Sequence, residues 1–442
     1  MSLLAADREL TRHSYYAATA VREADYPSLQ GSEEADVAIV GGGLAGLSAA
    51  IELADRGFDV VLLEAEQVGW GASGRNGGQA IHGLACDMAK IEQQLGLDEA
   101  RRVWDMTVEA LDLIVARCER FAIDCDWTPG HLALAVNARK GRELQAWADR
   151  IESVYRYALT RIAPAEVPRW IASPRYHNGV HDPRSGHMHP LKYSLGLARA
   201  AHRLGVRVFE RSAVTALEHG ATVTLRTARG RVRARQALLA GNVYLQAFGE
   251  AVAPRLAPRI MPVGTYIVGS APLPAELART LIPSRSAVSD TNFVLEYFRL
   301  TPDDRLLFGG RVSYSTVTPM NLAGSMRRRM TRAFPQLADV PVEYAWGGFV
   351  DISMSRAPDF GRLQPAGASA RASNVYYLQG FSGHGLALTG LAGKLVAEAI
   401  AGDASRFDTF ARLRHRPFPG GRWLRTPALV LGMAYYRMRD LL

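Results

Sequence analysis

The sequence predicts an α/β fold in which two layers are interleaved along the chain, one of them mostly antiparallel. Three observations lead to this prediction. A strand–turn–helix–strand unit occupies residues 36–65. Short apolar strands separated by turns follow one another between residues 206 and 241. Near the far end of the chain, residues 374–400 again read as a strand, a glycine-rich turn and a helix.

The unit at residues 36–65 has the order of a dinucleotide-binding βαβ unit. An apolar strand runs into a G-x-G-x-x-G turn, a helix rich in Ala and Leu follows, and a second apolar strand ends at Glu64. Gly41 permits the tight turn, Gly43 lets the backbone approach a pyrophosphate, and Gly46 allows close packing of helix on strand. The helix N-terminus offers N–H groups to the phosphates, and Glu64 can accept hydrogen bonds from a ribose diol. A bound dinucleotide is therefore predicted.

Composition places the chain among soluble globular proteins. Its 442 residues suit two interleaved domains, with 48% hydrophobic and 21% charged residues. Cys86, Cys118 and Cys125 are scattered, which predicts free thiols, a reducing compartment and no metal site. Residues 1–34 contain no apolar segment of the kind found in a secretory signal, so a cytoplasmic location is expected.

The net charge of +9 raises the question of nucleic-acid binding. The basic residues are mostly Arg, widely dispersed and not interleaved with aromatic residues. Solvated surface arginines are the preferred interpretation, and no nucleic acid is expected as a partner. Near the C-terminus, the apolar run at 428–436 is flanked by arginines and is too short to span a bilayer. We interpret this tail as a helix docked on the protein, and contact with a membrane surface is the alternative.

The remaining elements are predicted from periodicity and breakers. Helices are expected at residues 98–121, 140–157, 191–204, 321–334 and 386–400. Strands are expected at residues 131–136, 206–210, 214–218, 222–227, 231–235, 237–241, 259–270, 293–300, 305–310 and 342–352. The close spacing of the strands between 206 and 241 predicts a small antiparallel meander.

Neither layer is contiguous in the sequence. The nucleotide-binding domain is expected to combine residues 36–90, 185–245 and 355–405. The substrate domain is expected to combine residues 91–184 and 246–354, and residues 406–442 form a C-terminal tail.

Two further glycine-rich loops decide which dinucleotide is bound. In the loop at 69–79, Ser73 and Arg75 can contact phosphate, while Gly77 and Gly78 let the backbone lie against a flat ring. The loop at 380–385 precedes a helix, whose N-terminus would offer partial positive charge to the N1–O2 edge of a reduced flavin. Nicotinamide enzymes seldom need a second contact of this kind, so FAD is the predicted cofactor.

With these motifs the chain resembles the D-amino-acid-oxidase-type, FAD-dependent amine oxidoreductases. The segments that carry the resemblance run essentially from end to end: 14–18, 71–79, 123–126, 186–191, 361–363, 380–385 and 417–422. The resemblance implies a discontinuous FAD-binding Rossmann-type domain interleaved with a mostly antiparallel substrate domain. Motifs and resemblance together predict cofactor contacts from Gly41, Gly43, Gly46, Glu64, Ala65, Ser73, Arg75, Asn76, Gly77, Gly78, Gln79, Val214, Gly241, Gly383, His384 and Gly385.

The resemblance also implies a reaction. A primary amine is oxidised to an imine, the imine is hydrolysed to an aldehyde and ammonia, and molecular oxygen reoxidises FAD with release of peroxide. Within the family, the chain is most similar to members whose small-molecule substrate is a gamma-glutamylated diamine. The amine must be neutral to react, and a dry aromatic pocket favours the neutral form by desolvation.

The candidate substrate contacts are Tyr297, Trp346, His384 and Arg356. Core packing is an equally good interpretation of Tyr297 and Trp346. His384 lies inside a loop expected to face the flavin, where it either contacts substrate or orients the loop. Arg356 could pair with the carboxylate of a gamma-glutamyl group, and a structural or surface arginine is the alternative.

Some features depart from known relatives. The early loop carries Arg75 and Asn76, with no His or Cys for covalent attachment, so noncovalent FAD is expected. The strand at 305–311 has no Lys of the kind that sarcosine-oxidising relatives place over the flavin. A dehydrogenase that passes electrons to another acceptor therefore stays open. A flavoprotein whose main role is nucleic-acid or membrane binding is the further alternative.

His187 and His189 lack a third ligand at useful spacing for a metal ion and are interpreted as structural.

Overall fold

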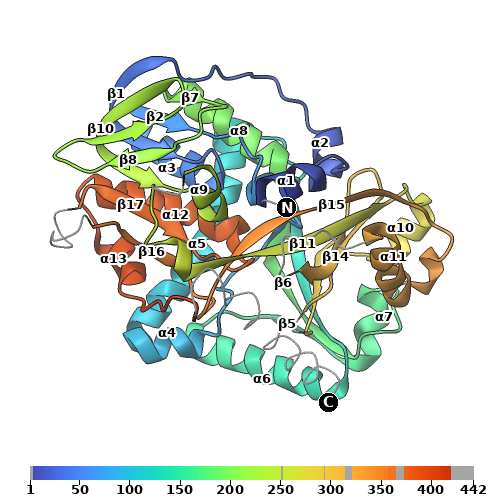
Figure 1. Cartoon of the computed structure of the whole chain (residues 1–442). Helices are drawn as coiled ribbons and strands as arrows, with labels where there is room; N and C mark the ends of the chain where they lie inside the picture. The colour runs from blue at the N-terminus through green and yellow to red at the C-terminus, as the bar shows by residue number, and fades with distance from the viewer. Residues whose placement is uncertain (1–2, 250–251, 293, 314–320, 365–372, 420–442) are drawn as a thin grey trace.

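The computed structural model describes all residues except 1–2, 250–251, 293, 314–320, 365–372 and 420–442. Two sheets form the framework, and the chain passes back and forth between them (Figure 1). This arrangement confirms the predicted α/β fold, with one largely parallel sheet and one largely antiparallel sheet built from interleaved segments.

The first sheet has a parallel core with antiparallel additions at its edge. Its order is β16 (Asp359–Arg362), β17 (Val375–Gln379), β10 (Gly230–Leu239), β1 (Gly31–Val40), β2 (Val60–Leu63) and β7 (Arg207–Phe209). Only β16 runs antiparallel in this series, and the short strands β8 (Ala216–Glu218) and β9 (Val223–Arg226) extend from β10. Helix α3 (Leu44–Ala54) packs between α8 (Pro190–Arg203) and α12 (Gly385–Ile400).

Strand β10 corrects part of the expected meander. Residues 231–235 and 237–241 were expected as two strands, but residues 230–239 form one strand. Its first half pairs antiparallel with β9, as a meander requires, while the strand also pairs in parallel with β1 and β17. The reason is burial: Ala237, Leu238 and Leu239 are fully enclosed, as is typical of a strand inside a parallel sheet.

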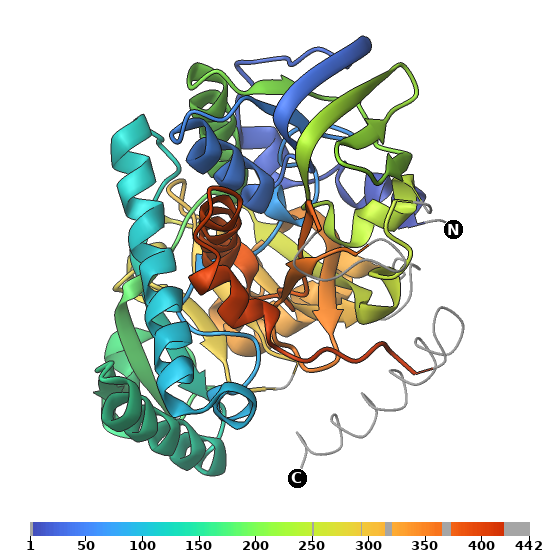
Figure 2. The ribbon, with the colours of Figure 1, turned by 90° about the vertical axis from the view of Figure 1, so that its left-hand side faces the viewer.

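The second sheet is antiparallel except where β12 meets β4. Its order is β15 (Val342–Ser353), β11 (Ile260–Ser270), β14 (Leu306–Ser313), β13 (Tyr297–Leu300), β12 (Ala287–Asp290), β4 (Thr128–Ala135), β6 (Asn178–His187) and β3 (Gln79–Ala80), with β5 (Thr160–Ile162) beside β6. Helix α11 (Leu322–Ala333) packs on β11, β14 and β15. In Figure 2 the long helix α5 (Leu97–Phe121) runs past both layers, with α6 (Ala138–Tyr155) near its lower end.

The predicted domain boundaries stay a prediction, although the strands follow the proposed alternation closely. The first sheet draws its strands from residues 31–63, 207–239 and 359–379, and the second from the segments between them. Two segments placed with the nucleotide domain lie in the second sheet instead, residues 185–187 at the end of β6 and residues 79–80. The segment at 79–80 pairs with β6.

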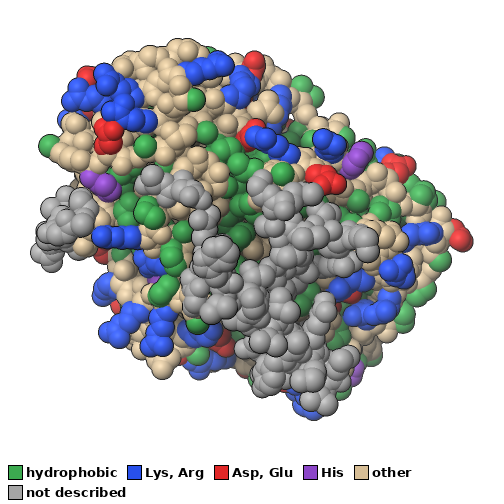
Figure 3. Space-filling view, in the orientation of Figure 1, with side chains coloured by type: hydrophobic (Ala, Val, Ile, Leu, Met, Phe, Trp, Pro, Cys, Tyr) green, Lys and Arg blue, Asp and Glu red, His purple; other side chains and the backbone are tan. Residues whose placement is uncertain are grey.

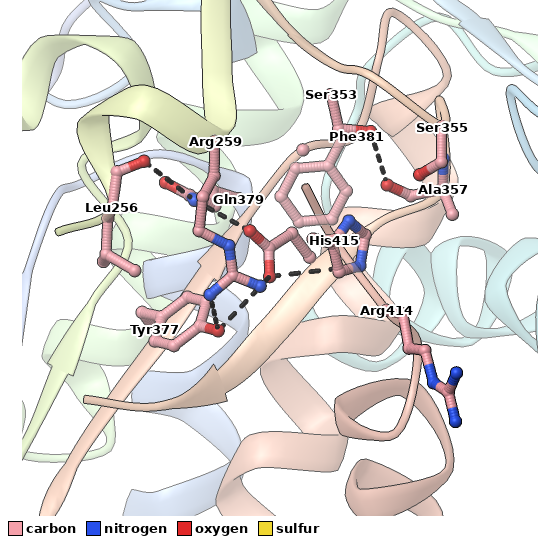
Figure 4. Close-up of polar contacts among 12 residues, drawn as sticks. Leu256, Arg259, Ser353, Ser355, Ala357, Tyr377, Gln379, Phe381, Arg414 and His415 are labelled. Carbon is pink, nitrogen blue, oxygen red and sulfur yellow. Dashed lines mark hydrogen bonds and ion pairs between the residues drawn. The ribbon is translucent and has the colours of Figure 1, made fainter. Parts of the chain in front are cut away.

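A buried carboxylate joins the two sheets where β11 begins. Asp359 is completely enclosed and accepts hydrogen bonds from Arg259 Nη2 at 2.7 Å, Gln379 Nε2 at 2.9 Å and the Tyr377 hydroxyl at 3.2 Å. His415 Nε2 lies 4.0 Å from the same carboxylate. Figure 4 shows these side chains converging from different segments. The cluster therefore holds the edge of the first sheet to the start of the second.

A second buried ion pair fixes the N-terminal helix α1 (Leu3–Leu10). Arg75 donates to both carboxylate oxygens of Asp7, at 2.9 and 2.5 Å, and to the Tyr244 hydroxyl at 3.2 Å. The two charged side chains are only 4% and 0% exposed. The next residue, Arg8, pairs with Glu66 at the surface, where its side chain is 60% exposed.

The distribution of basic side chains and the search for membrane-spanning helices bear on the predictions about nucleic-acid and membrane binding. Lys and Arg side chains are spread over the face in Figure 3 rather than gathered in one stripe. No single helix among the described residues has the length and apolar character to cross a membrane; α12 and α13 (Ser405–Ala411) meet the criteria only together, as a pair bent by 118°. The tail at 428–436 lies outside the described residues.

The two neighbouring ion pairs of α1 allow a matched stability test. Asp7→Asn should lower the free energy of unfolding by about 3–5 kcal/mol, because it leaves the buried Arg75 charge without its counterion. Arg8→Ala should cost less than about 1 kcal/mol, since an exposed pair contributes little. Thermal unfolding of the holoprotein measures both. Equal losses of unfolding free energy in the two variants would show that the buried Asp7–Arg75 pair contributes no more to stability than the exposed Arg8–Glu66 pair.

Candidate active site

The first of two cavities opens at the carboxyl ends of β1 and β2 and holds about 870 Å³ of empty space, its open mouth included. Ligands of parallel α/β sheets bind at this edge. The predicted cofactor residues that line it are Gly41, Gly43, Glu64, Ala65, Ser73, Val214 and Gly241. Sequence reasoning missed other residues of its wall, among them Trp70, Asn242, Tyr244, Phe248, Phe381 and Thr389.

The turn before α3 has the shape of a phosphate cradle. Gly41 has φ of 113°, which an L side chain rarely adopts. A Cβ on Gly46 would collide with the Gly41 carbonyl oxygen, and one on Gly43 would lie 2.7 Å from Ser73 Oγ. Gly43 is the N-cap of α3, and the Leu44 N–H that follows it donates to Ser73 Oγ at 3.0 Å, so a phosphate would meet the remaining N–H groups of the first turn at the cavity wall. These features fit a bound pyrophosphate.

Glu64 lies where a ribose partner is expected. One of its oxygens accepts the Gly42 N–H at 2.6 Å and the other accepts the Glu66 N–H at 2.9 Å. Burial raises the pKa of Glu64 to about 7, despite these two hydrogen bonds. A carboxylate has about four acceptor positions, so two donors leave room for a diol.

The loop at 71–79 is held by its own polar side chains, which corrects part of the sequence prediction. The guanidinium of Arg75 is occupied by Asp7 and Tyr244, and Arg75 is not among the residues that line the cavity. Asn76 bonds within the loop, to Ala72, Ser73 and Gly78, and Gln79 donates to the Val288 carbonyl at 2.9 Å. These side chains shape the loop, while Gly77 and Gly78 stay candidates for backbone contact only.

Trp346 and Tyr297 pack around the same loop. Trp346 is completely buried and donates from Nε1 to the Arg75 carbonyl at 3.0 Å. The ring of Tyr297 lies so close to Gly77 that a Cβ there would be 2.6 Å away. Neither residue lines either cavity. The structure therefore favours core packing over substrate contact for both residues.

The loop at 380–385 is positioned by another buried carboxylate. Asp351, at the end of β15, accepts the backbone N–H groups of Gly380 and Phe381, and its carbonyl accepts the Ser382 N–H at 2.8 Å. Burial raises the pKa of Asp351 to about 6, although these hydrogen bonds act in the opposite direction. The second sheet thus fixes the loop from which α12 begins.

His384 is the N-cap residue of α12 and lines the second cavity, while Phe381 of the same loop lines the first. Its Nε2 is 2.8 Å from the carbonyl oxygen of His82, so Nε2 carries the hydrogen and donates it. Burial lowers the pKa of His384 to about 4. The imidazole is therefore neutral at physiological pH. Its neighbours Gly383 and Gly385 line neither cavity.

The second cavity, of about 660 Å³ with its open mouth, lies beyond His384. Its walls are aromatic and apolar, with two acids and three imidazoles; those that matter below are His82, Trp104, His131, Trp147, Asp182 and His384. His82 Nδ1 lies 2.8 Å from Asp182 Oδ2. Tyr157 donates to the other oxygen of Asp182, also at 2.8 Å.

Sequence reasoning missed this cavity almost entirely. His82 and Asp182 are one hundred residues apart, so no local spacing relates them. One signal was available: His82 follows directly after the glycine-rich loop at 69–79. His187 and His189, by contrast, are bonded within the protein, His187 Nε2 to the Arg285 carbonyl and His189 Nδ1 to the Lys192 N–H.

Arg356 stands near the second cavity without lining it. It occupies the turn between β15 and β16, half-buried, with a left-handed φ of 62°. Its charge reaches two groups that do line the cavity. Burial lowers the pKa of His384, and Arg356 adds to that effect; burial raises the pKa of the Cys86 thiol to about 11, and Arg356 opposes it.

Comparisons with known proteins agree with this geometry. Residues 36–399 match the family described as FAD dependent oxidoreductase (DAO). The chain is 44% identical over 433 residues to gamma-glutamylputrescine oxidoreductase of Escherichia coli K12, covering 98% of this chain and 99% of that protein. It is 37% identical over 429 residues to a probable oxidoreductase, OrdL, of Haemophilus influenzae, covering 97% of each.

Solved structures share the fold. Glycine oxidase from Geobacillus kaustophilus superimposes with a TM-score of 0.71 at 21% identity, over 87% of this chain and all of that one. L-Proline dehydrogenase from P. horikoshii gives a TM-score of 0.68 at 19% identity, over 84% of this chain and 94% of that one. The family match covers most of the sequence, and the first cavity fits the dinucleotide it implies. The chain belongs to the DAO family of FAD-dependent oxidoreductases, and FAD is its cofactor.

Proposed function

We propose that this enzyme oxidises a primary amine of the gamma-glutamylputrescine type to an aldehyde and ammonia. Molecular oxygen would be the electron acceptor, with release of peroxide, and FAD would be bound noncovalently. The Escherichia coli relative is a gamma-glutamylputrescine oxidoreductase, and the chain matches it over nearly its full length, which supports this substrate class. The observation that carries the proposal is the second cavity, which His384 of the loop at 380–385 lines together with aromatic and apolar side chains, two acids and two further imidazoles.

The chain's own residues prepare the amine for reaction. Bound FAD supplies a two-electron acceptor for the hydride on the carbon next to the nitrogen. Trp104, which is buried, and Trp147, which is 36% exposed, place aromatic surface on the cavity wall, and a wall of low polarity disfavours the charged form of the amine. The uncharged His384, held by the His82 carbonyl, adds no repelling charge beside it.

Arg356 is the proposed partner for a glutamyl carboxylate. It carries a fixed positive charge close enough to affect two residues of the cavity wall, and a planar guanidinium can bind a carboxylate through two parallel hydrogen bonds. A substrate with an amine at one end and a carboxylate at the other would then extend from the neighbourhood of His384 toward Arg356.

The direct test is anaerobic mixing of the yellow holoprotein with amines, followed by admission of air. Gamma-glutamylputrescine should bleach the flavin faster than putrescine, and air should restore the colour with one peroxide per amine. Acid precipitation should release intact FAD into the supernatant, because the first cavity offers no attachment residue in its early loop. Flavin that stays with the precipitate would refute noncovalent binding, and recovery of colour only with an added carrier would identify a dehydrogenase.

Glu64 should make FAD binding depend on pH. The ribose diol donates to the ionised carboxylate, so bound FAD favours ionisation and lowers the pKa of Glu64 below its cofactor-free value of about 7. Affinity should therefore be constant above pH 7 and fall as the pH drops below it. Glu64→Gln should weaken binding at pH 8 by about 10- to 100-fold, as expected for loss of a charge-assisted bond, and should abolish this pH dependence. Fluorescence titration of apoprotein with FAD measures both.

Glu66→Gln is the matched control for Glu64, because Glu66 is the neighbouring acid and pairs with the exposed Arg8. Its FAD affinity should match the wild type at every pH. An unchanged affinity in Glu64→Gln would show that this carboxylate is not the ribose partner.

Arg356→Lys should raise the KM for the glutamylated amine about tenfold or more, since Lys cannot reproduce the bidentate fork. Putrescine has no carboxylate, so its KM should change little. Arg139→Lys, an exposed arginine of α6, serves as the control. Equal losses for the two amines would assign Arg356 a structural role.

A further inference from the structure

The second cavity contains a side-chain pair that the proposed oxidation does not yet use. We propose that His82, oriented by Asp182, takes the proton from the substrate's ammonium group in this cavity. The inference rests on the proposed function and deepens it, because it identifies the ligand of the cavity as an alkylammonium ion and names the group that converts it to the reactive amine. His82 would be a catalytic residue and Asp182 a positioning residue.

The hydrogen bonds around Asp182 determine which nitrogen of His82 is free. The carboxylate accepts His82 Nδ1 at 2.8 Å, the Tyr157 hydroxyl at 2.8 Å, the Arg184 N–H at 3.0 Å and the Ser185 N–H at 3.2 Å. Burial opposes ionisation, but the hydrogen bonds from His82, Ser185 and Tyr157 hold the pKa of Asp182 below its usual range. Because an ionised carboxylate only accepts, Nδ1 carries the hydrogen and Nε2 is the basic nitrogen.

Nε2 of His82 makes no hydrogen bond to any residue in the described part of the chain. The imidazole lines the cavity and is surrounded by aromatic rings: Tyr157 at 4.7 Å, Trp104 at 5.1 Å and Trp147 at 6.3 Å between centroids. Aromatic faces attract a cation such as an alkylammonium. The buried ring of Trp104 lowers the polarity around the ammonium group, which makes its proton easier to lose to a neighbouring base.

The other titratable groups near His82 are poorer proton acceptors. The titratable and charged groups that face it or lie close to it are Asp182, Tyr157, His131, His384, Cys86, Asp87 and Arg356. Burial lowers the pKa of His131 to about 3 and that of His384 to about 4. Cys86 is protonated at neutral pH, since burial raises the pKa of its thiol to about 11. Asp87 accepts the Ala89 N–H as the N-cap of α4, and Nε2 of His131 and of His384 each has a partner within the protein. His82 therefore offers the cavity an imidazole nitrogen that is free to take a proton.

The proton balance of the step is simple. The ammonium R–CH₂–NH₃⁺ gives one proton to His82 Nε2 and keeps the electron pair of the broken N–H bond as its lone pair. The imidazolium that forms is paired with ionised Asp182. FAD is the oxidant of the reaction that follows, in which the carbon loses a hydride and a C=N bond forms. No further co-reactant is needed for the transfer to His82.

The test compares the pH dependence of anaerobic flavin reduction in the wild type and in His82→Asn. Asparagine can still donate to Asp182 but cannot take a proton. At pH 7 the limiting reduction rate should fall about 100-fold or more, the usual range for a lost general base. The rate should recover as the pH approaches about 10, where an alkylamine loses its proton in solution. His181 lies on the same strand as Asp182 but packs at a tilt against Trp170 and does not line the cavity, so His181→Asn should behave as the wild type.

Two further variants separate proton transfer from structure. Asp182→Asn should show the same loss and alkaline recovery, because an amide that donates to Nδ1 forces the proton onto Nε2. His82→Ala should regain activity with added imidazole. Binding is measured independently through the fluorescence of Trp104 and Trp147, with tert-butylamine, which has no hydrogen on the carbon next to nitrogen. Its dissociation constant at pH 10 should stay within about threefold of the wild-type value in a variant that retains the cavity.

The outcomes distinguish the proposal from the proposed function. Alkaline recovery in both His82→Asn and Asp182→Asn, with imidazole rescue of His82→Ala, supports the proton transfer. A wild type that is reduced by amines while His82→Asn keeps the wild-type pH profile overturns the role of His82 and leaves amine oxidation standing. A loss in His82→Asn that is equal at every pH, or one explained by weaker binding, also overturns it. A wild type whose flavin no amine reduces overturns both.

Discussion

The architecture depends on buried carboxylates at the crossing between the two sheets. The chain leaves the second sheet along β15 and enters the first through β16 and β17. At this crossing Asp351 holds the backbone of residues 380–382, and Asp359 joins Arg259 to Gln379. A buried carboxylate without such donors would be very costly, so the partners on both sheets must stay in place. That constraint positions the loop that gives Phe381 to the wall of the cofactor cavity and His384 to the wall of the second cavity.

Burial also sets the chemistry of the two cavities. It raises the pKa of Glu64 to about 7 and lowers that of His384 to about 4, because in each case the charged form loses hydration. Asp182 behaves differently despite its burial, since several donors meet its carboxylate. The result is a cavity that contains one well-oriented imidazole, His82, beside an ionised acid, and two further imidazoles, His131 and His384, that stay neutral.

The glycine-rich loop at 71–79 is held in place by hydrogen bonds that involve two buried arginines. Arg75 reaches Asp7 on α1, and the buried Arg299 donates to the carbonyl oxygens of Gly77 and Met188. Such buried guanidinium groups are tolerated only when their hydrogen bonds are satisfied. Trp346 adds a hydrogen bond to the same loop from the core. The side chains of Arg75 and Asn76 thus bond within the protein, while Ser73 of the same loop lines the first cavity.

The sequence by itself determined the nucleotide unit, because its signals are local: the glycine spacing at 41–46, the acid at 64 and the apolar strands are read within thirty residues. The helix and strand periodicities likewise located most elements correctly. Only the tertiary structure decided which polar side chains face a cavity. Arg75 pairs with Asp7, 68 residues away, and His82 pairs with Asp182, 100 residues away. No sequence pattern predicts such pairings. The roles of these side chains depend on contacts between distant segments, because the packing of those segments determines which group each buried charge contacts.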